Sequence, residues 1–418
     1  MDNLTHSLVG LLVGETAATV SATSTAGMPV AKKRTALLGL MLIGSNFPDF
    51  DLLYTALDRS KLGYLLQHRG YTHTIIGALL GTLLMLGVCE LWMRRQQLQP
   101  TRQDRMQLIG IALLGPLLHI ALDYTNSYGV HPFWPVYDGW LYGDSVFIIE
   151  PLLWSVAAPL AFLLRSNLAR YAIMIALAAG AALCFFSGLV PLLAAGVYLL
   201  TTLTLLALAK YASPRTALFA GIGGWALTTL VFTSASHIAQ SRMEALASTQ
   251  FPDMITLDRV LTPMPVNPLC WDVLLVQKDA ANLVVRRAML SLAPGVIRAD
   301  RCPDGVAATQ MTAPLHAVAR ADLPSIRWRG EVITSLSRLH ELVATDCRAE
   351  GFMRFARAPW MNRIESASDK KSQLVIGDLR YDREAGLGFA ELALGAKQEN
   401  CPRHVPPWLP PRGDLFAN

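Results

Sequence analysis

The first 237 residues contain a succession of apolar runs that approach the length of a membrane-spanning helix. A helix of about 20 apolar residues crosses the hydrocarbon core of a bilayer. The runs therefore predict an α-helical polytopic membrane bundle of seven or eight spans. Seven predicted spans are residues 36–57, 71–93, 106–124, 147–164, 170–187, 190–209 and 216–237. Residues 4–20, which contain Glu15 and several threonines, form a weaker eighth.

Composition excludes several classes of protein. Only 16% of the 418 residues are charged, whereas a soluble domain carries roughly 25%. Together with a mean hydropathy of +0.35, this excludes a disordered chain and a wholly soluble enzyme. The net charge of +5 is modest and no long block of Lys and Arg occurs, so nucleic acid is not an expected partner.

The character of the chain changes near residue 237, beyond which charges are frequent and no apolar run is long enough to span. The sequence predicts a membrane bundle over 1–237, a linker over 238–268 and a soluble, β-rich α+β domain over 269–418. The linker is expected because Leu261–Pro268 contains three prolines, which favour extended chain. Short apolar runs punctuated by Pro and Gly favour strands in the domain that follows.

Basic residues are distributed unevenly between the loops on the two sides of the predicted bundle. If each of the seven spans crosses once, eleven Lys and Arg residues fall on one side. Only Arg59, Lys61 and Arg69 fall on the other. Cytoplasmic loops carry the excess of Lys and Arg. We therefore expect the C-terminal domain to lie outside the plasma membrane, in the periplasm if the cell has one.

Four of the six cysteines lie in the C-terminal region, at Cys270, Cys302, Cys347 and Cys401. Disulfides persist in exported domains. The four cysteines suggest two disulfides, with three possible connectivities, and four buried thiols are the alternative.

Ionisable residues within membrane spans are costly and are functional candidates by default. The order of the spans puts these residues toward one face of the membrane, opposite the basic loops. They are His6, Asp49, Asp51, His68, His73, His119, Asp123, Asp144 and Glu150. Any single histidine could be a buried interhelical hydrogen-bonding residue, but so many histidines and carboxylates at one face indicate a metal site.

The spacing of these residues suits metal binding. His119 and Asp123 are four residues apart, which puts an imidazole and a carboxylate on one face of a helix. His68 and His73 lie on either side of a glycine turn that leads into a predicted helix. Arg69, within the same turn, is either a surface charge or a group that binds an anion.

Asp49 and Asp51 follow Pro48, which disfavours helix at the preceding residue and lacks a backbone donor. We therefore expect an irregular segment here. Irregular backbone at membrane depth is tolerated where it is buried in protein or lines a watery cavity. The sequence predicts a polar cavity close to this turn.

Mixed imidazole and carboxylate ligands favour a divalent metal, zinc first and manganese or iron as alternatives. The candidates exceed the needs of a single zinc ion, so one or two ions can be bound. The expected ligands are Asp49, Asp51, His68, His73, His119 and Asp123, with His6 as a further candidate. Asp144 and Glu150 are the expected catalytic carboxylates, one of them as a general base. Asp144 could instead cap a helix that begins at Ser145.

The same segments carry a family resemblance. They are Met1–His6, Asn46–Asp51, His68–His73, His119–Gly129 and Trp140–Pro151, within about residues 1–165. In this ordered series the N-terminal half resembles the bacterial membrane-bound metal-dependent hydrolase family, known mainly as a domain of unknown function. That family usually has Asp before the proline that ends the series, where this chain has Glu150.

The resemblance implies a multi-pass metal-dependent hydrolase of the bacterial inner membrane. The His-x-x-x-Asp element is similar to one in zinc-dependent phospholipases C and related nucleases, which suggests phosphoester chemistry. A site level with the head groups favours a lipid-linked substrate, with membrane lipids or a small molecule as partners. The aromatic residues near these segments could frame such a site or form an ordinary interfacial belt. They are Tyr71, Tyr124, Tyr128, Trp134, Tyr137, Trp140 and Tyr142.

Two other functions fit the same residues. An ion-coupled transporter also uses buried carboxylates and a broken helix, although the polar residues here lie near one face and the spans show no internal repeat. A non-catalytic membrane protein could use the metal only to hold its helices together.

Overall fold

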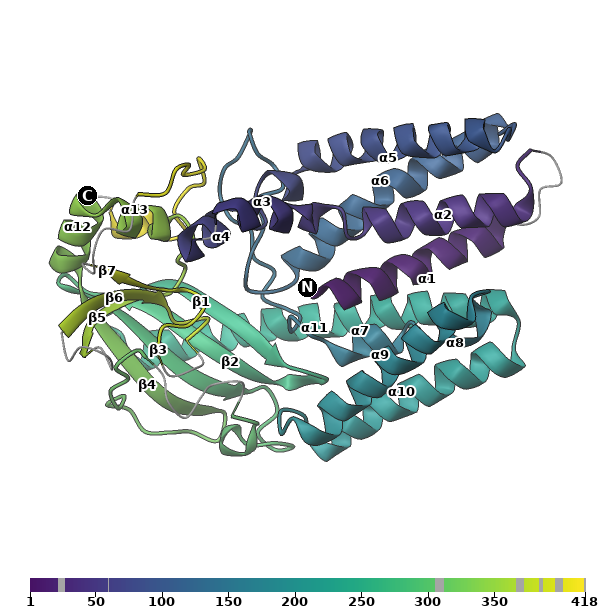
Figure 1. Cartoon of the computed structure of the whole chain (residues 1–418). Coiled ribbons are helices and arrows are strands. Elements are labelled where there is room, and N and C mark those ends of the chain that lie inside the picture. Colours follow the sequence, from purple (N-terminus) through teal and green to yellow (C-terminus); the bar gives the residue numbers. More distant parts are fainter. Residues whose placement is uncertain are drawn as a thin grey trace.

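The computed structural model describes residues 1–21, 27–58, 60–304, 312–365, 372–382, 386–394 and 401–416. Helices form one half of the molecule and two antiparallel sheets form the other (Figure 1). The helical half contains α1 (Asn3–Ser21), α2 (Val30–Gly44), η1 (Pro48–Phe50), α3 (Asp51–Asp58), α4 (Lys61–Gln67), η2 (Tyr71–His73), α5 (Ile75–Arg95), α6 (Arg102–Tyr124), α7 (Pro151–Ser155), α8 (Leu160–Leu163), α9 (Asn167–Phe186), α10 (Leu192–Tyr211) and α11 (Pro214–Gln250).

Among the described residues, five helices are long and apolar enough to cross a membrane: α5, α6, α9, α10 and α11. The expected count of seven or eight spans is not confirmed. The run 36–57 is not one helix, because α2 ends at Gly44 and Pro48 begins a separate 3-10 turn. The run 147–164 is divided into α7 and α8, with Pro159 between them. Proline lacks the N–H that a continuous helix requires.

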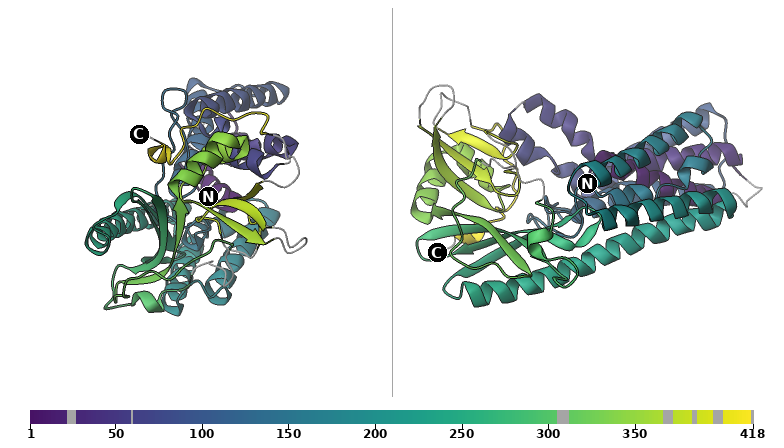
Figure 2. Two further views of the ribbon diagram at one scale, coloured as in Figure 1. Left: turned by 90° about the vertical axis from the view of Figure 1, so that its left-hand side faces the viewer. Right: turned by 90° about the horizontal axis from the view of Figure 1, so that it is seen from below.

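Helix α11 joins the two halves. Its 37 residues extend about 55 Å at 1.5 Å per residue, well beyond the roughly 30 Å of a hydrocarbon core. Its C-terminal part leaves the other helices and runs along the sheet (Figure 2). Ala235, Ala239 and Met243, spaced four residues apart, pack there against the strands. Where a linker was predicted at 238–268, the structure has the end of this helix and the first strand.

The larger sheet is a four-stranded antiparallel meander in the order β1-β2-β3-β4, and a three-stranded sheet has the order β5-β6-β7. The strands are β1 (Ile255–Met264), β2 (Asn267–Lys278), β3 (Asn282–Ser291), β4 (Ile326–Ser335), β5 (Pro359–Glu365), β6 (Ser372–Asp378) and β7 (Glu391–Leu394). The other elements of this half are η3 (Ala299–Arg301), α12 (Leu336–Thr345), α13 (Cys347–Met353) and η4 (Gly413–Leu415).

The larger sheet packs against other elements on both faces. Because side chains alternate along a strand, neighbouring residues of β2 reach opposite clusters. In β2, Trp271 and Val273 pack in the cluster that includes α11. Leu274 and Val276 pack in the opposite cluster, which includes Trp360 of the smaller sheet. The prediction of a C-terminal β-rich domain is thus confirmed in its antiparallel sheets.

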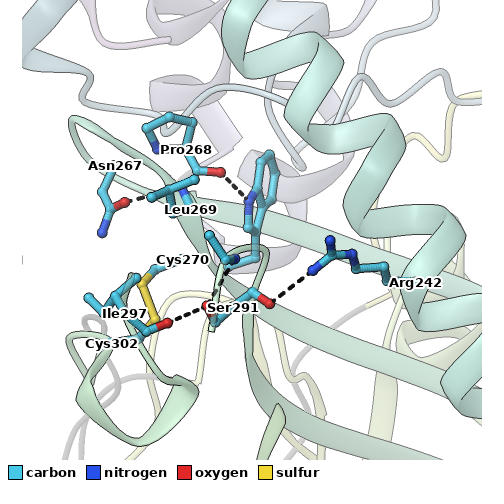
Figure 3. Close-up of a disulfide and its surroundings, with 10 residues drawn as sticks. Arg242, Asn267, Pro268, Leu269, Cys270, Ser291, Ile297 and Cys302 are labelled. Atoms are coloured by element: carbon cyan, nitrogen blue, oxygen red, sulfur yellow. Dashed lines mark hydrogen bonds between the residues drawn. A yellow bond between two sulfur atoms is a disulfide. The ribbon is translucent and has the colours of Figure 1, made fainter. Parts of the chain in front are cut away.

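The four C-terminal cysteines form two disulfides. Cys270–Cys302 ties β2 to the segment after η3, close to the Arg242 guanidinium of α11, which donates to the Ser291 carbonyl oxygen at 3.5 Å (Figure 3). The same guanidinium donates to the Leu292 carbonyl oxygen at 2.6 Å. Cys347–Cys401 ties α13 to the C-terminal segment. Of the three connectivities that the sequence leaves possible, the structure has the one that pairs the first cysteine with the second and the third with the fourth.

The C-terminal half packs on the loop between α6 and α7. Arg380 donates to the Ser127 carbonyl oxygen at 2.7 Å, and the Trp140 indole donates to the Arg354 carbonyl oxygen at 2.8 Å. Tyr128 and Trp140 are buried in this contact. Part of the aromatic group that the sequence suggested as a frame or an interfacial belt therefore forms the contact surface of the C-terminal half.

Candidate metal centre

Six of the predicted ligands meet in one cluster. The elements α3 and α4, which contribute to it, lie at the end of the helical half that faces the sheets (Figure 1). Asp49 lies in η1, Asp51 begins α3, His68 follows α4, His73 ends η2, and His119 and Asp123 lie in α6. The cluster contains two groups whose donor atoms all lie within 4.8 Å of one another. Asp49, His73, His119 and Asp123 form the first group, and Asp49, Asp51 and His68 form the second.

The first group has the dimensions of a tetrahedral site. His73 Nε2 and His119 Nε2 are 3.2 Å apart. Asp123 Oδ2 lies 3.2 and 3.3 Å from these two nitrogens, and Asp49 Oδ1 lies 3.4 and 3.5 Å from them. Ligands bound tetrahedrally to zinc at about 2.0–2.1 Å are about 3.3 Å from one another. These five separations therefore fit one small divalent cation.

Partners on the side away from the first group orient the His119 and His73 imidazoles. His119 Nδ1 lies 2.8 Å from the Ser45 carbonyl oxygen, which can only accept a hydrogen bond. We therefore assign the ring hydrogen to Nδ1, which leaves the Nε2 lone pair facing the first group. His73 Nδ1 lies 3.3 Å from Asp51 Oδ2 in the same way. Histidine ligands of metals are oriented by carbonyl or carboxylate partners of this kind.

Close packing of α2 against α6 brings the Ser45 carbonyl to His119. A Cβ atom built on Gly115 would lie 2.8 Å from the Gly44 Cα, so only glycine fits at this crossing.

The proline that follows Gly115 in α6, Pro116, cannot donate to the Ala112 carbonyl oxygen. The Thr82 hydroxyl of α5 donates to that oxygen instead, at 3.2 Å.

Asp51 organises the turn that carries the other histidines. Its Oδ2 accepts the Arg69 backbone N–H at 2.8 Å, and its Oδ1 lies 3.1 Å from His68 Nδ1. Arg69 has a positive φ of 58°, so the hydrogen bond fixes a backbone conformation that an L-residue rarely adopts. Burial raises the pKa of Asp51, but hydrogen bonds from His68 and His73 outweigh burial and hold it below its ordinary value.

The second oxygen of Asp123 faces away from the first group. Its Oδ1 lies 2.9 Å from the Arg69 guanidinium and 3.3 Å from His6 Nε2, and it also contacts the amino group of Met1. The His6 ring stacks on His119 with centroids 3.7 Å apart. His6 therefore contacts two of the predicted ligands, Asp123 and His119, but belongs to neither group of donor atoms.

A cavity of about 340 Å³ lies beside the cluster. Asp49, His68 and Arg69 line its polar part, and Tyr64, Tyr128 and Phe389 are among its aromatic residues. Arg69 is held in place by the Asn126 side-chain oxygen at 3.1 Å and lies over the Tyr128 ring. A cavity with a polar part thus lies beside Asp49, near the turn at which the sequence predicts a polar cavity, and much of its remaining lining is aromatic or apolar.

Asp144 and Glu150, the predicted catalytic carboxylates, bond instead to the C-terminal half. The Arg357 guanidinium donates to both oxygens of Asp144 at 2.8 Å and also pairs with Asp258 of β1. Both oxygens of Glu150 accept the Val266 backbone N–H, at 3.2 and 3.1 Å. These contacts account for their burial without catalysis, and their catalytic role stays a prediction.

Sequence reasoning missed three contributors to the site. The Ser45 carbonyl has no signal in the sequence, because it acts through its backbone. Tyr381 and Phe389 reach the cavity from a half of the chain in which the sequence offered no catalytic pattern. Arg69, by contrast, was singled out by the sequence, because it lies inside the same motif as His68 and His73.

Residues 1–195 match a family model described as YdjM inner membrane protein. Over 153 residues the chain is 25% identical to the uncharacterized protein YfhP of Bacillus subtilis (strain 168). That alignment covers 37% of this chain and 43% of YfhP, so the chain spans less than half of that curated relative. No solved structure matches the chain. The matches support a membrane protein related to an inner-membrane family, and the hydrolase family suggested by the sequence is not confirmed.

Proposed function

We propose that the chain is a metal-dependent hydrolase of the bacterial inner membrane, acting on a phosphoester or lipid-linked substrate at the outer face. The observation that carries the proposal is the first group, in which five donor separations of 3.2–3.5 Å fit a tetrahedral cation. Zinc suits this mixture of imidazole and carboxylate best, with manganese or iron as alternatives.

The second group supports a dinuclear centre. It shares Asp49 with the first group, so one carboxylate could bridge two ions. Bound divalent ions would supply Lewis acidity and a water acidic enough to attack at neutral pH. Paired ions of this kind suit the displacement at phosphorus that phosphoester hydrolysis requires.

The protein's own groups suit an anionic substrate. Arg69 lines the cavity and is 2% exposed, so its charge acts in a water-poor environment. Its planar guanidinium matches the oxygens of a phosphoryl group. If only the first group holds an ion, His68, whose Nδ1 is held by Asp51, would instead orient substrate or move a proton in the same cavity.

The proposal is tested by the metal content of detergent-purified protein. We expect near-stoichiometric zinc or manganese in the wild type, and loss of that metal in the His119→Ala/Asp123→Ala variant. His237→Ala, which changes an exposed histidine of α11, is the matched control and should keep the metal. Absence of tightly bound metal from folded wild type would overturn the proposal and favour the transporter hypothesis.

Activity is then measured on the metal-loaded protein. Phosphate monoesters, phosphate diesters and short-chain phospholipids are supplied to the wild type and the metal-free variant. We expect turnover of at least one class by the wild type only. Metal without turnover of any class, together with unfolding on chelation, would favour the structural role for the metal.

A further inference from the structure

Five aromatic rings that line the cavity contact one another in a closed circuit. From Tyr64 the circuit passes to Phe389, Tyr381, Tyr128 and His68 and then returns to Tyr64. The successive ring centroids are 5.5, 5.3, 5.9, 5.6 and 5.0 Å apart. We call these five residues the aromatic collar. Such separations are typical of packed aromatic pairs.

The collar is built by both halves of the molecule. Tyr64, His68 and Tyr128 belong to the helical half, whereas Tyr381 and Phe389 belong to the C-terminal half. Thr262 of β1 also lines the cavity. The helical half alone therefore leaves the cavity without part of its wall.

Specific contacts hold Phe389 against the helical half. The Lys61 ammonium of α4 donates to the carbonyl oxygens of Leu387 and Gly388, both at 2.8 Å. Glu391 accepts the Gly388 N–H at 2.8 Å from the other side. The segment that carries Phe389 is thus fixed by hydrogen bonds from both halves, and the position of the ring does not depend on apolar packing alone.

The chemistry of the cavity changes from charged to apolar. The Arg69 guanidinium, which lines the cavity, suits an oxyanion. The collar and the neighbouring Leu52, Val146 and Phe147 offer apolar surface. A cationic group in the collar would face the Arg69 guanidinium, which lies 4.5 Å from the Tyr128 ring centre. The lining therefore suits a ligand with one anionic end and one uncharged, apolar arm.

We propose that the C-terminal half selects the substrate: Tyr381 and Phe389 complete a collar that admits a phosphoester whose alcohol part is apolar. The proposal rests on the proposed metal-dependent function, which accounts for the phosphoryl end of the substrate. It adds the chemical class of the alcohol part of that substrate. Phe389 is a specificity-determining residue in this scheme, and its contacts with Tyr64 and Tyr381 set the shape of the apolar part.

Binding of non-hydrolysable alkylphosphonates tests the proposal without requiring turnover. Methyl-, butyl- and hexylphosphonate are titrated calorimetrically into zinc-loaded full-length protein in nanodiscs. For a buried chain, affinity rises about threefold to fourfold per methylene. We expect such a rise in the wild type and a markedly flatter series in Phe389→Ala, because the variant removes part of the apolar lining. Phe389→Leu, which keeps apolar volume, should restore most of the dependence on length.

Phe416→Ala is the matched control, because Phe416 lies in the same half and packs on His340 outside the cavity lining. Each sample is also assayed for metal. Protein without metal would contradict the proposed function itself. Bound metal with no chain-length dependence, or with a dependence that Phe389→Ala leaves intact, would overturn the collar proposal. Tighter binding of phosphocholine than of butylphosphonate would overturn the apolar assignment.

Discussion

Gly44 and Gly115 contribute to the candidate metal centre although neither can bind a metal. Their contact lets α2 approach α6 closely enough for the Ser45 carbonyl to accept from His119. We predict that Gly115→Ala forces the helices apart, moves this carbonyl away from the imidazole and lowers zinc affinity roughly 10- to 100-fold, the range for lost outer partners of a ligand. Competition with a chelator of known affinity measures the change.

Gly110→Ala is the control for this prediction. Gly110 lies in the same helix, and a Cβ atom built there meets nothing within 4 Å. Zinc affinity should equal that of the wild type. Equal affinities for Gly110→Ala and Gly115→Ala would show that the close approach of the helices does not orient His119.

His68 belongs only to the second group of donor atoms, and it is less deeply buried than His73. We predict that His68→Ala lowers the metal content from two ions to one per chain, because the first group keeps all four of its donors. Elemental analysis after dialysis against metal-free buffer measures the stoichiometry. An unchanged content of one ion in both proteins would assign His68 to the cavity wall and would leave a mononuclear centre.

At the scale of elements, the segment before β7 should respond to pH. Burial and then the nearby Asp382 carboxylate raise the pKa of Glu391 to about 7, although the Gly388 N–H opposes this rise. The folded protein therefore holds this proton more tightly than the unfolded chain. The stability that Glu391 contributes is present below its ordinary pKa of 4.5 and falls as pH rises through about 7.

Glu391→Gln removes this titration. We predict that its melting temperature relative to wild type rises by a few degrees between pH 5 and pH 8.5. Thermal unfolding of the full chain in detergent at both pH values measures the difference. Glu341→Gln, at an exposed position of α12, should show no such trend. Parallel melting curves for wild type and Glu391→Gln at both pH values would contradict the prediction.

The elements that the sequence predicts best are those with a local cause. The four-residue spacing in α6 puts His119 and Asp123 on one helix face, and Pro48 ends the helical run before Asp49. The span count fails for a related reason. Apolar composition persists through Pro48 and Pro159, so hydropathy joins segments that the backbone separates.

Non-local packing accounts for what the sequence did not predict. The alanine face of α11 continues beyond the apolar run, and its partner is a sheet that forms from later residues. The bonds of Asp144 to Arg357 and of Glu150 to Val266 cross between the two halves. Buried carboxylates predict a partner of opposite charge or a hydrogen-bond donor, but their type does not distinguish a catalytic partner from a structural one.

At the scale of the whole molecule, the candidate metal centre and the C-terminal half lie at the same end of the helices (Figure 1). The turn between α5 and α6 lies at the opposite end, near Arg94 and Arg95. The excess of basic residues at that end and the two disulfides at the other both favour a cytoplasmic turn and an extracytoplasmic C-terminal half. This orientation would expose the cavity to substrates on the outer face of the membrane.

Cysteine labelling in whole cells tests the orientation. The native cysteines are buried or form disulfides, so an introduced thiol dominates the reaction. We predict that Ser337→Cys, on the exposed face of α12, reacts with a membrane-impermeant maleimide in cells whose outer envelope is permeabilised while the inner membrane stays intact. Gln96→Cys, in the turn after α5, should react only after the inner membrane is permeabilised. The reverse labelling pattern would show that the cavity faces the cytoplasm, and the substrate would then have to be cytoplasmic.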